Sequence, residues 1–329
     1  MRKVLGMLGL LLAVSLTVTI VEPMVTGRSA FTSAANLRNL ATWTGLFGIL
    51  GVGEAFVIIT GGIDLSVGSV VGLVGILSAM FLKDYGMSPA VAVPLVLLIS
   101  VLMGLVHGLL VTKLRIQPFV VTLCGLLIYR GIARGIAHDE TRGFGTGFES
   151  LKFLARGVVP GIGVPMPLIL LILVAVAATV FLHMSVYGRY LFALGRNEEA
   201  ARFSGVNVDR MKILAYVICS LLAGFSGLLF ALNINSLQPS NFGSFYELYA
   251  IAAAVLGGCS LRGGEGVIAG VVIGSAILRV LPNLVNLLGI RSELVFAVIG
   301  GVILIGVIAD ELIRARTQKR MAKERAQRQ

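Results

Sequence analysis

Ten long apolar runs follow one another along this sequence, and the polar stretches between them are too short to form a soluble domain. A helix needs about 20 apolar residues to cross a bilayer. Only 13% of the 329 residues are charged, against about 25% in a typical soluble domain. We therefore expect an all-α, polytopic membrane protein in which residues 1–329 form one transmembrane domain of about ten transmembrane helices. The runs cover approximately residues 4–22, 40–60, 66–82, 90–112, 118–137, 164–184, 213–232, 247–258, 265–282 and 292–309.

The net charge of +11 is concentrated beside the apolar runs rather than on one surface. Arg2 and Lys3 precede the first run, and further Lys and Arg residues gather in the segment 185–212 and in the tail 310–329. Such clusters mark the cytoplasmic side of spanning helices. We expect a multi-pass protein of the plasma (inner) membrane, with cytoplasmic N- and C-termini, a basic cytoplasmic tail and no nucleic-acid partner. The first run exceeds a typical signal-peptide core, so we expect it to be a retained helix.

The sequence lacks the common motifs of enzymes and metal proteins. It contains no Gly-Lys pair and therefore no GxxxxGK[ST] phosphate-binding loop, and no HExxH. Its three cysteines form no CxxC, so neither a disulfide framework nor a zinc site is indicated. We expect no enzymatic activity, no metal and no cofactor bound by this chain.

The segment 60–69 interrupts an otherwise apolar stretch with Gly61, Gly62 and Asp64. Two compatible interpretations remain open. Transporters place substrate contacts at broken helices of this kind, and irregular backbone at membrane depth must be buried in protein or line a cavity. Alternatively, Asp64 caps the next helix by accepting from the N–H of Ser66 or Val67. We take Asp64 and Ser66 as candidate residues of a substrate pathway.

Glu54 is a second carboxylate inside an apolar run, with no basic residue in reach along its own helix. Such a group is protonated, paired across the bundle, or facing water, and it suggests a functional role. We add Glu54 to the candidate pathway. Asn233 joins it, because an amide at the end of the seventh run can hydrogen-bond a polyol.

The segment 193–208 predicts a short capped helix on the cytoplasmic side, inside the loop 185–212. Asn197 is suited to the N-cap, Glu198 and Glu199 to the first turn, and Gly205 to the end of the helix. A capped helix between two spans fits the docking of a cytoplasmic partner, to which Ala200 and Ala201 would present a small-residue surface. The candidate coupling residues are Asn197, Glu198, Glu199, Ala200, Ala201, Arg202, Ser204 and Gly205.

Residues 61–68 match residues 257–264 at four of eight positions, three of them glycine. Each stretch is followed by a GxxxG pair. Because the chain contains 41 glycines, an internal repeat and a chance match both remain open.

These segments resemble the permease subunits of ABC importers for monosaccharides of the ribose, xylose and galactose type. The run Gly61-Gly62-Ile63-Asp64-Leu65-Ser66-Val67-Gly68 is similar to that family's most recognisable stretch. Gly195-x-Asn197-x-x-Ala200-Ala201-x-x-Ser204-Gly205-Val206, with Lys212 and Ala223-Gly224-x-x-Gly227, resembles its cytoplasmic coupling loop, where branched-chain amino-acid permeases are also similar.

The resemblance implies a homodimeric or heterodimeric permease with two kinds of partner. One is a cytoplasmic subunit that binds the ATP and docks on the helix near residues 196–206. The other is a soluble sugar-binding protein outside the cytoplasm. We therefore expect alternating access driven by the ATPase. The alternative is an autonomous secondary transporter that uses Glu54 or Asp64 as a proton site.

Overall fold

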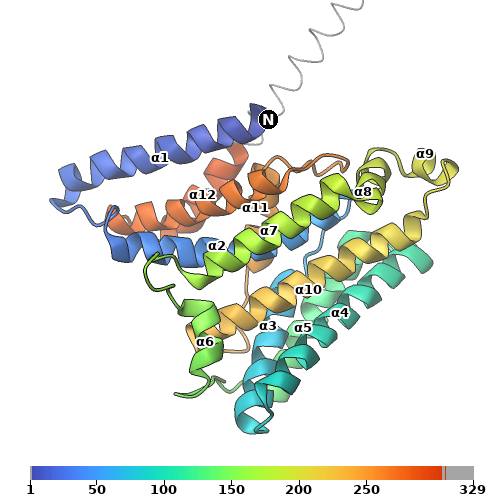
Figure 1. The fold of residues 1–329 in the computed structure, drawn as a ribbon, viewed down its shortest axis with the longest axis horizontal. Coiled ribbons are helices and arrows are strands. Elements are labelled where there is room, and N and C mark those ends of the chain that lie inside the picture. Colours follow the sequence, from blue (N-terminus) through green and yellow to red (C-terminus); the bar gives the residue numbers. More distant parts are fainter. Residues whose placement is uncertain (1, 306–307, 309–329) are drawn as a thin grey trace, which may run out of the picture.

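The computed structural model describes residues 2–305 and 308, whose regular structure is helical apart from two isolated β-bridges (Figure 1). The expected basic tail 310–329 lies outside the described residues. The helices are α1 (Arg2–Thr26), α2 (Ala34–Ile59), α3 (Val67–Ala79) with a π-helical continuation (Met80–Asp84), α4 (Pro89–Lys113), α5 (Pro118–Ala137), α6 (Glu149–Arg156), α7 (Met166–Met184), α8 (Val186–Arg196), α9 (Glu198–Phe203), α10 (Val208–Ile234), α11 (Tyr246–Leu256), α12 (Ile268–Leu287), a 3₁₀ turn (Ser292–Leu294) and a last apolar helix (Val295–Ile305).

Within the described residues, each of the ten apolar runs lies mainly on a helix, which confirms the helical membrane architecture. Eight described helices are long and apolar enough to cross a bilayer, whereas α11 and Val295–Ile305 are shorter. The 11 residues of α11 extend only about 16 Å at 1.5 Å per residue, less than the hydrocarbon core of about 30 Å. The eighth run is therefore not a full span by itself, because Gly257 and Gly258 end the helix early.

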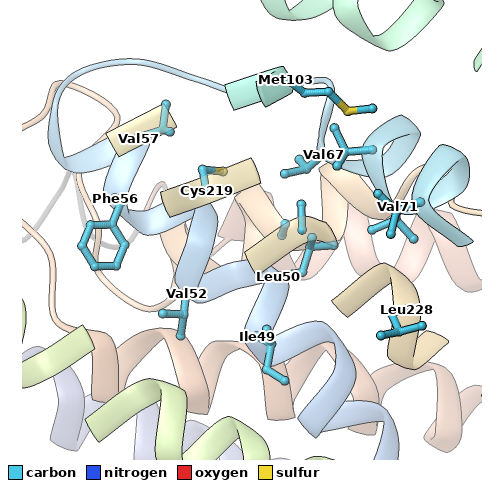
Figure 2. Packing of buried hydrophobic residues seen from close by; sticks show 14 of the residues in the cluster. Ile49, Leu50, Val52, Phe56, Val57, Val67, Val71, Met103, Cys219 and Leu228 are labelled. Atoms are coloured by element: carbon cyan, nitrogen blue, oxygen red, sulfur yellow. The ribbon is translucent and has the colours of Figure 1, made fainter. Parts of the chain in front are cut away.

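Helix α2 forms the centre of the bundle. Every residue from Thr44 to Ile59 is buried, and α7, α10, α11 and α12 pack around it. Figure 2 shows Leu50 of α2 among buried side chains of the same cluster, with Cys219 and Leu228 of α10 on neighbouring turns. A helix that is apolar and buried all round belongs in the interior of a bundle, so α2 positions the elements that surround it.

Helices α4 and α10 pack closely through two glycines of α4. A Cβ atom at Gly108 would lie 2.7 Å from Cα of Ile213, and one at Gly104 would lie 2.9 Å from Cα of Val217. Neither position has room for a side chain, so the Gly104/Gly108 pair lets the two backbones approach, as small residues do in membrane helices.

The two ends of the bundle carry different short helices. In Figure 1, α6 lies at one end, and α8 and α9 lie at the opposite end. We refer to these as the α6 end and the α9 end. Helix α1 runs along α12 at the edge of the bundle, where Val18 and Phe31 pack with Val280.

Candidate functional site

The chain turns back sharply between α2 and α3. The Gly62 amide donates to the Val57 carbonyl (3.1 Å) and the Gly61 amide to the Ile58 carbonyl (2.9 Å), while Gly61 has a φ of +82°. This is a common glycine-dependent helix ending. Residues 63–66 then return into the bundle, so α3 begins with its first residue buried. We call residues 60–66 the first turn.

Asp64 accepts from the Ser66 amide, as the capping interpretation predicted, but the N-cap residue of α3 is Ser66 itself, so Asp64 holds the turn that precedes the helix. Its Oδ1 accepts hydrogen bonds from the Ser66 amide (2.8 Å) and from the Ser66 hydroxyl (2.6 Å). Both side chains are fully buried. Asp64 and Ser66 are thus bonded to each other within the first turn, and neither lines a water-accessible surface in this structure.

Glu54 holds the same turn from the preceding helix. Its Oε1 accepts from the Asp64 amide (3.0 Å), and its Oε2 lies 3.7 Å from the Cys219 sulfur of α10. Glu54 is fully buried. It therefore does not face water, and its carboxylate contacts groups inside the bundle. The carboxylate supplies the acceptor that a buried backbone amide requires.

The buried His107 and the half-buried Tyr129 complete this polar cluster and were not identified as site residues from the sequence. Asp64 Oδ2 lies 3.7 Å from His107 Nδ1, and His107 Nε2 lies 2.9 Å from the Tyr129 hydroxyl. The sequence contains one indication that His107 is buried. It lies between Gly104 and Gly108, a glycine pair that is typical of closely packed helices. Among the described residues, no group of three or more His, Cys, Asp and Glu side chains is arranged to hold a metal ion.

Asn233 does not join the cluster. It lies in the last turn of α10, 14 residues beyond Cys219, which corresponds to about 21 Å along the helix. The structure therefore brings together three of the four candidate pathway residues and places the fourth near the α6 end.

A second turn, between α11 and α12, repeats the geometry of the first. The Cys259 amide donates to the Ala254 carbonyl and the Gly258 amide to the Val255 carbonyl, each at 2.9 Å, and Gly258 has a φ of +89°. Gly258 is therefore the counterpart of Gly61. The equivalence is shifted by one residue from the sequence match, which paired Gly61 with Gly257.

The two turns meet against α8. The Gly264 amide donates to the Ile59 carbonyl (2.8 Å), and a Cβ at Gly195 of α8 would overlap both of these groups. Gly195 is thus the point at which the segment 185–212 touches both glycine turns.

The short helix expected after Asn197 is present as α9. The Asn197 side chain accepts from the Ala200 amide (2.9 Å), and Gly205 follows the helix with a φ of +85°. Glu198 and Glu199 occupy its first turn. The expected cap, acidic turn and glycine ending are confirmed.

The surface of α9 differs from the one we expected. Ala201 is buried against the rest of the chain, so it cannot belong to an exposed small-residue surface. Phe203, which was not among the candidates, is instead 89% exposed. Arg202 contacts Glu198 (3.3 Å) and Asp209 (3.7 Å) of its own chain. Ala200, Ser204 and Gly205 are exposed.

A groove of about 700 Å³ lies beside α9. Its walls come from the α4–α5 connection and from the start of α10, with Arg115, Glu199, Phe203 and Lys212 among the lining residues. An exposed large aromatic side chain beside a groove lined by both charges is typical of a protein-binding surface.

The helices and sites define a multi-pass helical membrane protein. Its buried polar groups hold its own turns, and its α9 end carries the exposed Phe203 beside a groove. The chain belongs to the family of permease components of branched-chain amino acid transport systems, whose family model matches residues 36–308.

Three relatives show the range of similar proteins. The chain is 40% identical over 282 residues to the ribose import permease protein RbsC of Escherichia coli (strain K12), covering 85% of this chain and 87% of the relative. It is 38% identical over 311 residues to RbsC of Bacillus subtilis (strain 168), covering 94% and 93%. It is 30% identical to the xylose transport system permease protein XylH of E. coli (strain K12), covering 88% of each chain. No solved structure matches this chain.

Proposed function

We propose that this chain is the permease subunit of an ABC importer that carries a monosaccharide across the inner membrane. The observation that carries the proposal is the 40% identity, over 85% of the chain, to a ribose import permease. A relative named for xylose supports the same substrate class. The partners would be a second permease copy, a cytoplasmic ATPase and a soluble sugar-binding protein.

The α9 end provides a route by which an ATPase would drive transport. In this proposal the ATPase contacts Phe203 and the neighbouring groove, and α8 passes the displacement to Gly195. Gly195 lies against both glycine turns, and these turns begin α3 and α12. A force on α9 would therefore reach both halves of the bundle. Such coupling requires contacts that differ between two states of the permease.

The proposed orientation places the α9 end in the cytoplasm. The Lys- and Arg-rich segment 185–212 supports this orientation, and α6 would then face the opposite side. A reporter inserted near Gly147, in the connection that contains α6, should be active only outside the cytoplasm. One inserted after Gly205 should be active only inside. The same side for both would contradict the topology.

Uptake into reconstituted vesicles tests the function. The permease, its ATPase and the binding protein should together accumulate ribose or xylose, and uptake should require ATP and all three components. Uptake by the permease alone, driven by a proton gradient, would instead support the secondary transporter that uses Glu54 or Asp64. Uptake of leucine but not of a sugar would instead indicate that the substrate is a branched-chain amino acid, as the family name suggests.

Replacing Phe203 tests the docking surface. Because an exposed aromatic anchor in an interface often contributes 2 kcal/mol or more, Phe203→Ala should weaken binding of the ATPase by roughly 30-fold and reduce uptake in parallel. The permease should still insert, because Phe203 is 89% exposed. Phe153→Ala, on α6 at the opposite end, is the matched control. Wild-type ATPase affinity in Phe203→Ala, measured by co-purification and titration, would contradict the docking role.

A further inference from the structure

A cavity of about 400 Å³ lies between α2, α11, α12 and the helix Val295–Ile305. Its residues on α2 and α12 come mainly from the N-terminal half of α2 and the C-terminal half of α12. It is therefore distant from the first turn, which follows the C-terminal end of α2. Arg279, one of its lining residues, lies eight residues before the end of α12, or about 12 Å from that helix end. The volume falls within the roughly 300–1,000 Å³ of small-molecule sites.

Arg279 has hydrogen-bond donors that the described part of the protein leaves unused. Its guanidinium carbon lies 3.9 Å from the ring centre of Phe47 and 4.4 Å from that of Tyr249. Its Nε and Nη2 atoms are buried and have no hydrogen-bond partner among the described residues. Because buried polar groups are nearly always paired, these two donors indicate a ligand or ordered water in the cavity.

The rest of the lining is aromatic and amide-bearing. Trp43 and Tyr246 add two further rings, and Asn39 and Asn286 add amide groups that are exposed and make no side-chain hydrogen bond within the described structure. Asn283 differs, because it exchanges hydrogen bonds with Asn36 (3.1 and 2.7 Å). None of the described residues that line the cavity is an Asp or a Glu.

We propose that this cavity binds the monosaccharide as it enters the permease, an inference that rests on the proposed function. The hydroxyl groups of a sugar accept from Arg279 and from the asparagine amides, and its apolar C–H face packs on the aromatic rings. A neutral polyol fits a cavity without carboxylates. The ammonium group of an amino acid would lie beside the Arg279 cation with no described carboxylate in the lining, and bringing a second positive charge into such a site is unfavourable.

The test measures ribose uptake by vesicles that contain the permease, its ATPase and the binding protein. Arg279→Gln should lower the initial rate of uptake at least tenfold, while complex assembly and ATP hydrolysis stimulated by the binding protein stay within twofold of wild type. Arg291→Gln is the matched control, because Arg291 is 81% exposed and lies outside the cavity. Uptake by this control should equal that of the wild type.

Trp43 supplies a second readout, because it is the only tryptophan of the chain. Ribose, but not leucine, should change the fluorescence of the purified permease in a saturable way, and Arg279→Gln should abolish the change. If Arg279→Gln does not assemble, Asn286→Ala, at the exposed rim of the cavity, tests the sugar site instead. A reduced uptake in Asn286→Ala supports the site, and normal uptake overturns it.

Uptake by the wild type and by Arg279→Gln together distinguishes a failure of the sugar site from a failure of the proposed function. Wild-type vesicles that take up no sugar would overturn both. Normal uptake by Arg279→Gln, beside normal uptake by the wild type, would overturn only the sugar site. If that variant also loses co-purified anionic phospholipid, the cavity is a lipid site.

Discussion

The Gly195→Ala variant should lose most of its transport activity. The added Cβ would overlap the Ile59 carbonyl oxygen and the Gly264 amide nitrogen, which are hydrogen-bonded to each other. Backbone atoms cannot move aside as a flexible side chain can, so α8 must shift or the two turns must separate. Overpacking of this kind costs about 1–3 kcal/mol, and it acts at the contact through which we propose that α9 drives the bundle. We expect uptake to fall at least tenfold.

The measurements are uptake in vesicles, membrane abundance and thermal unfolding of the purified complex. Gly131→Ala and Gly135→Ala on α5 are matched controls, because a Cβ at either position meets no atom within 4 Å. Alanine in a helix is favoured over glycine by about 0.5–1 kcal/mol, so both controls should be at least as stable as the wild type. Wild-type uptake by Gly195→Ala would remove Gly195 from the coupling route.

The second large effect is expected for Asp64→Ala. This change removes the acceptor of the Ser66 amide and hydroxyl, both of which are buried with Asp64. A buried donor left without a partner costs about 1–3 kcal/mol, so we expect a destabilisation of about 2–5 kcal/mol. The start of α3 should loosen, and the amount of folded protein in the membrane should fall.

Asp64→Asn is the matched control, because its amide oxygen still accepts at the position of Oδ1. We expect this variant to keep membrane abundance and uptake close to wild type. A fall in uptake at normal abundance would instead assign the carboxylate charge to the substrate pathway. Equal unfolding temperatures for Asp64→Ala and the wild type would contradict the role of Asp64 in holding the first turn.

Much of the architecture was determined by the sequence alone. In the part of the chain that the structure describes, each apolar run lies mainly on a helix, because a chain in lipid must pair every backbone N–H and C=O within itself. The Asn197 cap and the hydrogen bond from the Ser66 amide to Asp64 were also predictable, because donor and acceptor are two or three residues apart and their pairing depends only on local conformation. The resemblance of the same two segments to sugar permeases was confirmed by the 40% identity to a ribose import permease, and the related branched-chain amino acid permease family matches residues 36–308.

Only the tertiary structure decided which distant groups meet. Nothing in the sequence places His107 beside Asp64, Arg279 over the Phe47 ring, or Gly195 against both glycine turns. The same limit explains the error at Ala201, which has a surface-like position in a short capped helix but packs against its own chain. The physical reason is that local hydrogen bonds and hydropathy act along the chain, whereas burial depends on how helices from distant parts of the sequence fit together.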